Sequence, residues 1–531
     1  MENVKFPPHN SEHCMIPMDP IHKNLTITLI RGPLVAPLGS FNNEPTPPLG
    51  LAFIASSLSQ AGFKVYGIDA TGEDIERVVS IQNSRLQYNG ISIEEIIERI
   101  PLPTKIIAFS AMFSHEWTFT KKMISSVKKA FPQAIVLCGG EHCTALPEYN
   151  LRDCPSIDYI VLGEGEETIV EFASKISHGE SPENVPGLAY IKNSQLVLTP
   201  PRARIKDVDE MAWPAWDIFP IEVYLNKAVS FGASFGRNMP IMASRGCPYQ
   251  CTFCSNPQMW TTRYNIRSPQ NVIDEIKLYK EKYKITGLQF YDLTAIIKKQ
   301  WIVEFCTKML EEKINLEWSL PSGTRSEALD DETLSLIAKS NCRYLVYAPE
   351  SGSQETLIRI KKKITLDKMK ESIRTALKYG IVVRANFILG FPHETRKNIF
   401  ETLKTQFHFA WMGVDEAPLY PFQPYPGSEL FKYLIGNGRI HLNDHYFDTL
   451  ATLSTGKFSV PDESFCEHIG RYELHFYRVM GFFLYYLLSY TLRPKRILRT
   501  LKNLFFSDKS STVFEQRIKD KLRRIQQSVS T

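Results

Sequence analysis

Short β-branched runs alternate with helix-like segments along two long stretches of the chain, and this order of elements narrows the possible folds. Strands separated by helices of roughly 10–15 residues predict parallel α/β sheets. The chain has 531 residues, which is more than one hydrophobic core usually supports, because single domains stop growing near ~250 residues. The sequence therefore predicts two large α/β domains.

The first series occupies residues 24–176. Ser92 and Glu95 have capping-box spacing at the start of its second helix. The series predicts a doubly wound, Rossmann-like domain that binds a ligand at the carboxyl ends of its strands. Residues 1–23, with four prolines and three histidines, are expected to be a loose leader. The expected strands are 25–30, 64–68, 106–110, 134–137 and 159–162, and the expected helices are 49–61, 93–100 and 120–130.

Residues 177–238 contain several Pro-containing stretches and are interpreted as a linker or small subdomain. A second alternating series of about six strand–helix units follows at residues 239–440 and predicts a partial (β/α)6 barrel. The active site of such a barrel lies at the carboxyl ends of the strands. Residues 441–531 are expected to form a mainly helical C-terminal region. The expected barrel strands are 240–244, 287–291, 316–320, 344–348, 382–389 and 416–419.

Cysteine content and the length of the apolar runs indicate the cellular compartment of the protein. Ten cysteines in 531 residues are too few for a disulfide scaffold, and no secretory signal opens the chain. The longest apolar run, at 479–492, has 14 residues, which is short of the ~20 that a membrane-spanning helix needs. We therefore expect a cytoplasmic protein without a transmembrane helix.

Three cysteines, Cys247, Cys251 and Cys254, form a C-x3-C-x2-C pattern after the first strand of the second series. Thiolates suit iron–sulfur clusters, and three of them would leave one iron of a [4Fe–4S] cluster with an open position. A structural zinc site, a redox pair at Cys251 and Cys254, and ordinary buried cysteines are the alternatives. No second C-x-x-C occurs in the chain, which weakens the zinc interpretation.

With Phe253 before its last cysteine, the triad resembles the cluster motif of the radical S-adenosylmethionine (SAM) superfamily. The resemblance implies that Cys247, Cys251 and Cys254 bind a [4Fe–4S] cluster and that SAM chelates the open iron. It also implies that one electron from the cluster cleaves SAM to a 5′-deoxyadenosyl radical. A low-potential donor such as flavodoxin or ferredoxin is the implied source of that electron.

Two further segments resemble SAM-binding turns of this superfamily. The segment 348–353 (APESGS) follows the fourth barrel strand, and the resemblance implies that Glu350, Ser351 and Ser353 contact polar parts of SAM. The segment 386–395 (NFILGFPHET) resembles the fifth-strand motif, whose backbone at Gly390 is implied to pack on the adenine. Both segments could instead be ordinary strand-to-helix turns with N-caps.

Two other polar residues are candidates for contacts with SAM. Asp292 follows the second barrel strand, where relatives often carry residues that hold the SAM ammonium group. Arg325 follows the third strand and could bind the SAM carboxylate through two N–H groups. An exposed arginine at a helix start is the alternative for this position.

Small residues follow three strands of the first domain, and such strand ends let a large ligand approach the backbone. The G-x-G-x-x-G pattern of a nucleotide site is absent. With P-P-L-G-L at 47–51, these loops resemble the cobalamin-binding domain of one subgroup of radical SAM enzymes. The resemblance implies that cobalamin is lined by Ser110, Gly139, Gly140, Gly163 and Gly165.

The cobalt of this cofactor has no obvious protein ligand in the sequence. The D-x-H-x-x-G motif that supplies a histidine in other cobalamin proteins does not occur, so the resemblance implies base-off cobalamin without that ligand. His115 and His142 are expected to be polar loop residues. The alternative is a doubly wound domain that no longer binds the cofactor.

The two resemblances together imply a function. A methyl group on cobalt and a 5′-deoxyadenosyl radical allow methylation of carbon that has no nucleophilic character. The chain is therefore expected to be a C-methyltransferase that consumes two SAM molecules and acts on a small-molecule or lipophilic substrate. The second possibility is an oxidoreductase or cyclase with the same cofactors, and the third is a cofactor-binding sensor or electron-transfer protein. No catalytic acid or base is indicated.

The C-terminal tail carries most of the basic charge. The net charge is +5, and residues 493–531 hold 11 Lys and Arg against 3 Asp and Glu. The aromatic run 482–488 precedes this tail, which is typical either of a packed helix with a solvated charged end or of peripheral contact with anionic lipid. A nucleic-acid partner is not expected, because no aromatic-interleaved stacking platform accompanies the basic residues.

Overall fold

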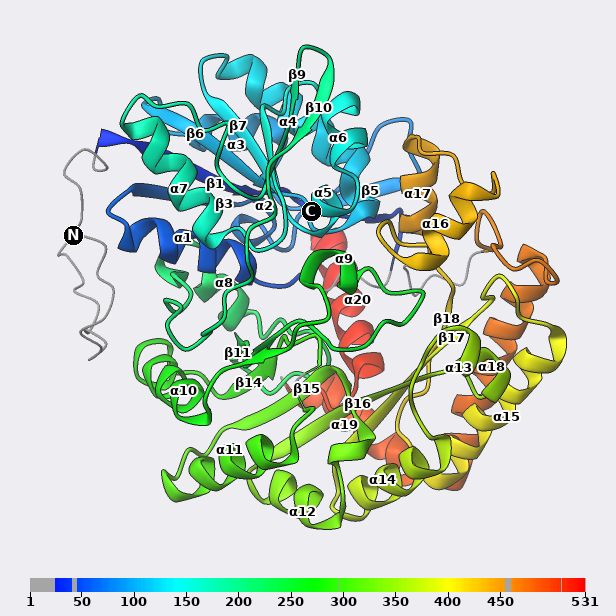
Figure 1. Ribbon diagram of the computed structural model, residues 1–531. Coiled ribbons are helices and arrows are strands. Elements are labelled where there is room, and N and C mark those ends of the chain that lie inside the picture. The colour runs from blue at the N-terminus through cyan, green and yellow to red at the C-terminus, as the bar shows by residue number, and fades with distance from the viewer. Residues whose placement is uncertain (1–23, 41–44, 295, 454–459, 508, 531) are drawn as a thin grey trace.

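The computed structural model describes residues 24–40, 45–294, 296–453, 460–507 and 509–530. It contains two α/β domains, which lie one above the other in Figure 1, and a set of helices that follows the second domain. The predicted fold class, a Rossmann-like domain followed by a partial barrel and a helical C-terminal region, is confirmed. The predicted leader, residues 1–23, lies outside the described residues.

The first domain is built on a seven-stranded sheet with the order β10-β9-β8-β7-β6-β1-β3. Five of these strands pair in parallel, so their carboxyl ends meet at one edge of the sheet. That edge is where a doubly wound fold binds its ligand. The parallel strands are β1 (Thr26–Arg31), β3 (Lys64–Asp69), β6 (Thr104–Ser110), β7 (Ile135–Gly139) and β8 (Tyr159–Val161).

Helices cover both faces of this sheet because successive strand residues point to opposite sides. Leu29 packs in one core cluster with residues of α1 (Leu49–Gln60) and α7 (Glu166–Ser177). Its neighbour Ile30 packs in a second cluster with residues of α3 (Ile93–Arg99) and α4 (Trp117–Ala130). The predicted capping box at the start of α3 is confirmed. Short helices follow two strand ends, α2 (Ala70–Glu73) after β3 and α5 (Glu141–Ala145) after β7, and α6 (Pro147–Asp153) comes next after α5.

Two antiparallel strands extend the first sheet beyond the predicted domain. β9 (Leu188–Lys192) pairs with β8 and with β10 (Gln195–Leu198). The interpretation of 177–238 as a linker or subdomain is therefore wrong for these two strands, because their pairing makes them part of the first domain. The same stretch also holds α8 (Ile221–Asn226). The other domain boundaries stay predictions.

A separate small sheet consists of β2 (Leu34–Pro37), β5 (Leu86–Asn89) and β4 (Val78–Ser80).

The second domain is a six-stranded parallel sheet with the order β11-β14-β15-β16-β17-β18. Within the described residues, the first and last strands do not pair with each other, so the barrel is open as predicted. The strands are β11 (Asn238–Ile241), β14 (Gly287–Phe290), β15 (Glu317–Thr324), β16 (Cys342–Glu350), β17 (Val382–Leu389) and β18 (Leu419–Pro421). The intervening helices are α10 (Pro269–Tyr283), α11 (Lys299–Glu311), α12 (Asp331–Lys339), α13 (Gln354–Arg359), α14 (Leu366–Lys378) and α15 (Arg396–Met412).

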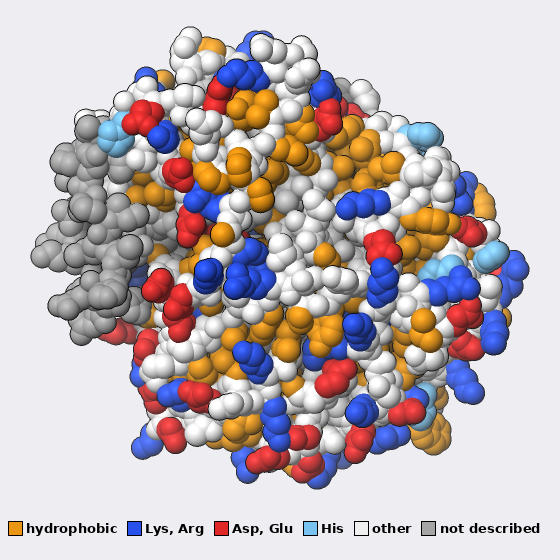
Figure 2. Space-filling model, in the orientation of Figure 1, with side chains coloured by type: hydrophobic (Ala, Val, Ile, Leu, Met, Phe, Trp, Pro, Cys, Tyr) orange, Lys and Arg blue, Asp and Glu red, His pale blue; other side chains and the backbone are white. Residues whose placement is uncertain are grey.

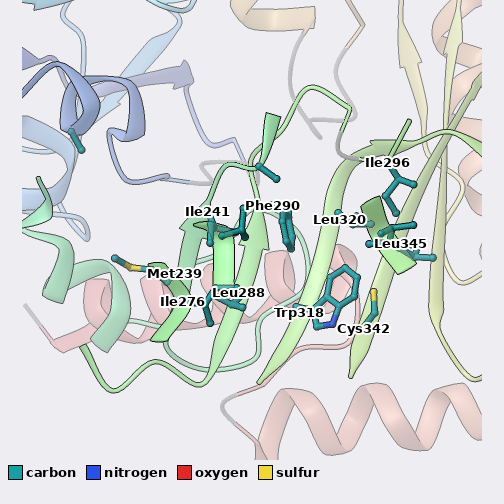
Figure 3. Close-up of a cluster of buried hydrophobic side chains, with 14 of the residues drawn as sticks. Met239, Ile241, Ile276, Leu288, Phe290, Ile296, Trp318, Leu320, Cys342 and Leu345 are labelled. Carbon is teal, nitrogen blue, oxygen red and sulfur yellow. The ribbon is translucent and has the colours of Figure 1, made fainter. Parts of the chain in front are cut away.

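The barrel strands and their helices share a large apolar core. Figure 3 shows part of it, with Met239 and Ile241 from β11, Leu288 from β14 and Trp318 from β15. These side chains are fully or almost fully buried. The core fixes the relative positions of the strand ends that carry the predicted site.

The C-terminal helices brace the open barrel. Ser510 forms an antiparallel bridge with Ser234, which precedes β11. The backbone N–H groups of Val513 and Phe514 donate to the Glu416 carboxylate, which precedes β18, at 3.1 and 2.7 Å. The segment therefore joins the two edge strands at their amino ends, opposite the cysteine loop. The helices are α16 (Glu429–Gly436), α17 (Asp444–Leu453), α18 (Arg471–Leu492), α19 (Lys495–Phe506) and α20 (Val513–Ser530). Across the described part of the chain, none of the helices combines the length and apolar character needed to cross a bilayer.

Candidate active site

The cysteine loop lies at the carboxyl end of β11, between β12 (Ser244–Arg245) and α9 (Asn256–Trp260). Cys247, Cys251 and Cys254 are all half-buried thiols. Burial raises the pKa of Cys254 to about 12 and raises that of Cys251 above its ordinary value, so these thiols would lose their protons on binding a metal. No metal-binding cluster of three or more His, Cys, Asp or Glu side chains is preassembled in the described residues. The assignment of the triad therefore rests on its spacing and on its position.

The loop is anchored to the ends of the neighbouring barrel strands. The Thr252 N–H donates to the Ile360 carbonyl at 3.1 Å, in the segment that follows β16. The ring of Phe253 lies against that of Phe391, which follows β17, with centroids 5.6 Å apart. The structure therefore brings the triad together with both predicted SAM-binding turns.

Glu350 lies at an irregular point between β16 and β17. Its φ is +63°, and the register of the two strands shifts between Tyr347 and Glu350. Its carboxylate accepts a hydrogen bond from Lys362 Nζ at 2.9 Å, and both side chains are about nine-tenths buried. The Lys362 ammonium acts to lower the pKa of the Cys251 thiol, against the larger effect of burial. Lys362 was missed by the sequence analysis, because it stands in a run of three lysines that has the pattern of a solvated surface.

Ser351 and Ser353 use their hydroxyls within the protein. Ser351 Oγ lies 2.9 Å from Thr402 Oγ1, and Ser353 Oγ accepts from Asn398 Nδ2 at 3.0 Å. Both serines are fully buried against α15. In this structure the hydroxyls fix the turn after Glu350, and their contact with SAM stays a prediction.

The turn at Gly390 is held by a buried carboxylate. Glu394 accepts from the N–H groups of Gly390 and Phe391 at 2.7 and 3.1 Å. Burial raises the pKa of Glu394 to about 7. Gly390 has φ of +87°, and an added Cβ would lie 2.8 Å from Leu474. Only glycine fits this point, because its backbone has a positive φ and packs against Leu474, and its contact with the adenine of SAM stays a prediction.

Asp292 faces the strand that leads into the cysteine loop. Its carboxylate accepts from the Ala243 N–H at 3.1 Å and from Ser244 Oγ at 2.5 Å. Burial raises the pKa of Asp292 to about 6. In this structure the Asp292 carboxylate holds this strand in place. Its contact with the SAM ammonium group stays a prediction.

Arg325 is buried rather than exposed, so the alternative of an exposed arginine is wrong. Its guanidinium carbon lies 3.8 Å from the ring centroid of Tyr249, inside the cysteine loop. The Nε atom is buried without a hydrogen-bond partner. This N–H next to the cysteine loop suits the carboxylate of a ligand.

The small residues predicted to line cobalamin lie at the carboxyl edge of the first sheet. Ser110, Gly139 and Gly163 end or follow β6, β7 and β8, and Gly165 precedes α7. Gly140 has φ of +113°, and an added Cβ would lie 2.6 Å from the Ala111 carbonyl. The close approach of the Gly140 and Ala111 backbones leaves no room for a side chain at this edge, and the contact of these residues with cobalamin stays a prediction.

This edge faces the segment that carries the cysteines. Arg245, two residues before Cys247, bonds Glu164 at 3.2 Å and Glu166 at 2.5 Å. Ser255, directly after Cys254, donates to the Glu141 carboxylate at the start of α5. The predicted corrinoid loops and the predicted cluster loop are therefore bonded to each other.

His142 is not a polar loop residue as predicted. It lies in α5, is 1% exposed, and packs between Trp117 and Phe447 with centroids 4.7 and 5.4 Å away. Burial lowers the pKa of His142 to about 3. Its ring is therefore neutral and enclosed by aromatic side chains.

A buried polar cluster at the ends of β1 and β3 was missed by the sequence analysis. The Tyr224 hydroxyl donates to Asp69 at 2.6 Å, and Arg31 lies 3.8 Å from the same carboxylate. Burial raises the pKa of nearby Glu116 to about 7. The cluster lies at the ligand-binding edge of the first sheet, and no local pattern marks it because Tyr224 comes from the distant α8.

Comparisons with known proteins agree with this geometry. The family model of the radical SAM superfamily matches residues 241–405, and that of the B12 binding domain matches residues 43–173. The uncharacterized methyltransferase PH0819 of Pyrococcus horikoshii is 30% identical over 417 residues, which cover 78% of this chain and 84% of that protein. The anaerobic magnesium-protoporphyrin IX monomethyl ester cyclase of Rubrivivax gelatinosus is 27% identical over 73% of this chain and 66% of that protein.

A solved structure supports the fold. The radical SAM methyltransferase TsrM from Kitasatospora setae matches with a TM-score of 0.60 and 16% identity, covering 78% of this chain and 76% of that chain. The chain belongs to the radical SAM enzymes that carry a B12-binding domain. The predicted cofactors, a [4Fe–4S] cluster, SAM and cobalamin, are those of this family and are confirmed, as is the prediction of an enzyme. The residues that bind them stay predictions.

Proposed function

We propose that this enzyme transfers a methyl group from SAM to an unactivated carbon of a small-molecule or lipophilic substrate. The observation that supports it best is the direct bonding of the cysteine loop to the ligand edge of the first domain, through Arg245 with Glu164 and Glu166. When bound, the cluster with SAM supplies a 5′-deoxyadenosyl radical and cobalamin supplies the methyl group. A single substrate between these two loops would reach both.

The chain's own residues have distinct tasks in this proposal. Cys247, Cys251 and Cys254 would hold the cluster through three thiolates. Lys362 and Arg325 place cationic N–H groups beside the cysteine loop, where they would orient the carboxylate of SAM. The hydrogen bond from Lys362 to Glu350 and the stacking of Arg325 on Tyr249 hold both groups in place before the ligand arrives.

The reducing electron would come from a low-potential donor such as flavodoxin or ferredoxin. The aromatic contact of Phe253 with Phe391 beside the cysteine loop would help to exclude water from this side of the site and so protect a radical from side reactions. We propose a small molecule rather than a nucleic acid as the substrate.

A second candidate is an oxidoreductase or cyclase that uses the same cofactors without methyl transfer. The similarity to the Rubrivivax gelatinosus cyclase favours it. The two functions share every structural feature described above, and they differ in the fate of the SAM methyl group.

Product analysis with methyl-deuterated SAM separates the two functions. Anaerobically reconstituted enzyme with a chemical reductant is incubated with fractionated cell extracts. Methyl transfer predicts a product that carries the deuterated methyl group on carbon, and the Cys251→Ala variant should form none. Products that lack the label while 5′-deoxyadenosine accumulates would favour the second candidate.

A further inference from the structure

Helix α19 has its polar face toward the protein and its apolar face outward, which is the reverse of an ordinary surface helix. Its polar side chains face the protein: Arg496 donates to the carbonyls of Val414 and Gly413 at 3.0 and 2.5 Å. Thr500 and Asn503 donate to the buried Glu515 carboxylate at 2.9 and 2.8 Å. The apolar side chains of α19 are therefore left on the outer face.

That outer face continues on the neighbouring helix. In α19, Leu498 is 69% exposed and Phe505 is 64% exposed, and the two lie seven residues apart on one stripe. In α18, Leu487 is 66% exposed, and Phe476 lies on the same side of that helix with 58% exposure. Single exposed apolar residues are ordinary, but stripes on two adjoining helices mark a surface that binds something apolar.

The charged residues of the segment that carries this surface have one sign. Residues 474–507 contain no Asp or Glu, and they contain six basic residues, Arg478, Arg493, Lys495, Arg496, Arg499 and Lys502. Lys495 and Lys502 are exposed on α19 beside the apolar stripe. On the face of the molecule shown in Figure 2, by contrast, acidic and basic side chains are interspersed.

An open groove lies beside the start of α19. It has a volume of about 460 Å³ and is lined by Arg493, Arg496 and Arg499 together with Lys378 and Asp415. Its basic side chains outnumber its single carboxylate, so the groove carries a net positive charge. Its guanidinium groups are bonded within the protein, Arg493 to the carbonyls of Ala410 and Trp411 and Arg499 to Asp415, so the groove would act on an anionic headgroup through this charge. Arg493, in the turn between α18 and α19, lines the groove, and Arg496 and Arg499 line it from the first half of α19.

We propose that the outer faces of α18 and α19 dock the enzyme on an anionic lipid bilayer. The apolar side chains would enter the level of the acyl chains, and Lys495 and Lys502 would lie at the level of the phosphates. Charge complementarity favours anionic lipid over a second copy of this chain, because a second copy would bring the same basic residues against each other. No described helix is long and apolar enough to span the bilayer, so the contact is peripheral.

The test is co-sedimentation of the full-length, cofactor-loaded enzyme with vesicles. Vesicles of phosphatidylglycerol and phosphatidylcholine should sediment the enzyme at low salt, and vesicles of phosphatidylcholine alone should sediment much less. High salt should weaken the binding, because basic residues act within a Debye length of the surface. Absence of binding to the anionic vesicles would overturn the proposal.

Variants locate the contact. Leu498→Glu with Phe505→Glu should lower the partition coefficient at least roughly tenfold, because two apolar side chains no longer enter the lipid. Lys495→Gln with Lys502→Gln should lower it roughly 30-fold on anionic vesicles. The control is Leu102→Glu, at a residue that is 90% exposed in the first domain, and it should bind as wild type does.

Two outcomes would contradict the assignment. Equal binding by the wild type and the Leu498→Glu/Phe505→Glu variant would place the lipid contact elsewhere. A dimer in light scattering without vesicles, converted to monomer by the same double variant, would assign the surface to a second copy instead. Because all four substituted side chains are exposed, their replacement should leave cluster content unchanged, which is measured as iron per chain.

Discussion

Arg245 of the barrel and Glu166 of the first domain form a buried ion pair, with Nη2 2.5 Å from Oε1. Arg245 stands two residues before Cys247, and Glu166 is the first residue of α7, next to the glycines of the predicted corrinoid edge. Glu164 bonds both Arg245 and Arg204, at 3.2 and 3.0 Å. This network ties the cysteine loop to the first domain and thereby fixes how the two cofactor sites face each other.

Removal of Arg245 should weaken the whole protein. Arg245→Ala leaves the buried Glu166 carboxylate without its partner, while Glu164 keeps Arg204, and the loss of one partner of a buried pair costs about 3–5 kcal/mol. The measurement is the thermal unfolding midpoint. Arg152→Ala is the matched control, because it breaks an exposed pair with Glu148 that contributes about 0–1 kcal/mol. Equal shifts in the two variants would show that the Arg245 network does not join the domains.

Glu394 should make stability depend on pH. Burial raises its pKa from 4.5 to about 7, so the folded protein keeps a proton that the unfolded chain has released. Stability should therefore fall as the pH rises from about 4.5 to about 7. The free energy of unfolding of the wild type minus that of Glu394→Gln should decrease over this range.

The control for this prediction titrates in the opposite direction. Hydrogen bonding to Asn398 lowers the pKa of the exposed Glu355. The corresponding difference for Glu355→Gln should therefore not decrease as the pH rises. A wild-type minus Glu394→Gln difference that stays constant with pH would refute the assigned proton.

Much of the barrel could be predicted from the sequence because its signals are local. β17 has the predicted bounds 382–389, and α12 begins after the N-cap Asp330, whose side chain accepts from the Thr333 N–H. The β9–β10 hairpin was not assigned to the first sheet, because the pairing of β9 with β8 that places it there joins segments distant in the sequence. In the structure Asn193 and Ser194 both have positive φ, 50° and 64°, as the two-residue turn of a hairpin requires.

The candidate site was predictable only in part, for a related reason. The spacing of the cysteines and the turns after the strands are local features of the sequence, so they could be predicted. The pairing of Arg245 with Glu166 and the approach of Lys362 to Cys251 depend on packing between distant segments. The same packing turned the hydroxyls of Ser351 and Ser353 toward α15, which the motif alone could not indicate.

The iron–sulfur cluster should depend on the cysteine triad and not on a buried cysteine elsewhere in the chain. Anaerobically reconstituted wild-type protein should hold about four iron and four sulfide per chain. Cys251→Ala should lose both the cluster and the cleavage of SAM. Cys306→Ala, at a fully buried cysteine of α11, should keep them. Stoichiometric zinc without iron in the wild type would restore the zinc alternative.

Bound cob(II)alamin should show no axial imidazole. The chain lacks the D-x-H-x-x-G motif, and His142 is enclosed by Trp117 and Phe447. The electron paramagnetic resonance spectrum should therefore lack the nitrogen superhyperfine splitting that an axial imidazole causes. The same spectrum from His142→Ala is the control. Splitting in the wild type that disappears in His142→Ala would contradict the enclosed ring.

The most direct test of the account is the ratio of SAM-derived products in an anaerobic assay with purified enzyme, reductant and methyl-accepting substrate fraction. Methyl transfer through both cofactor sites predicts equal amounts of 5′-deoxyadenosine and S-adenosylhomocysteine, together with an equal amount of methylated product. The formation of 5′-deoxyadenosine without S-adenosylhomocysteine or methylated product would contradict the account.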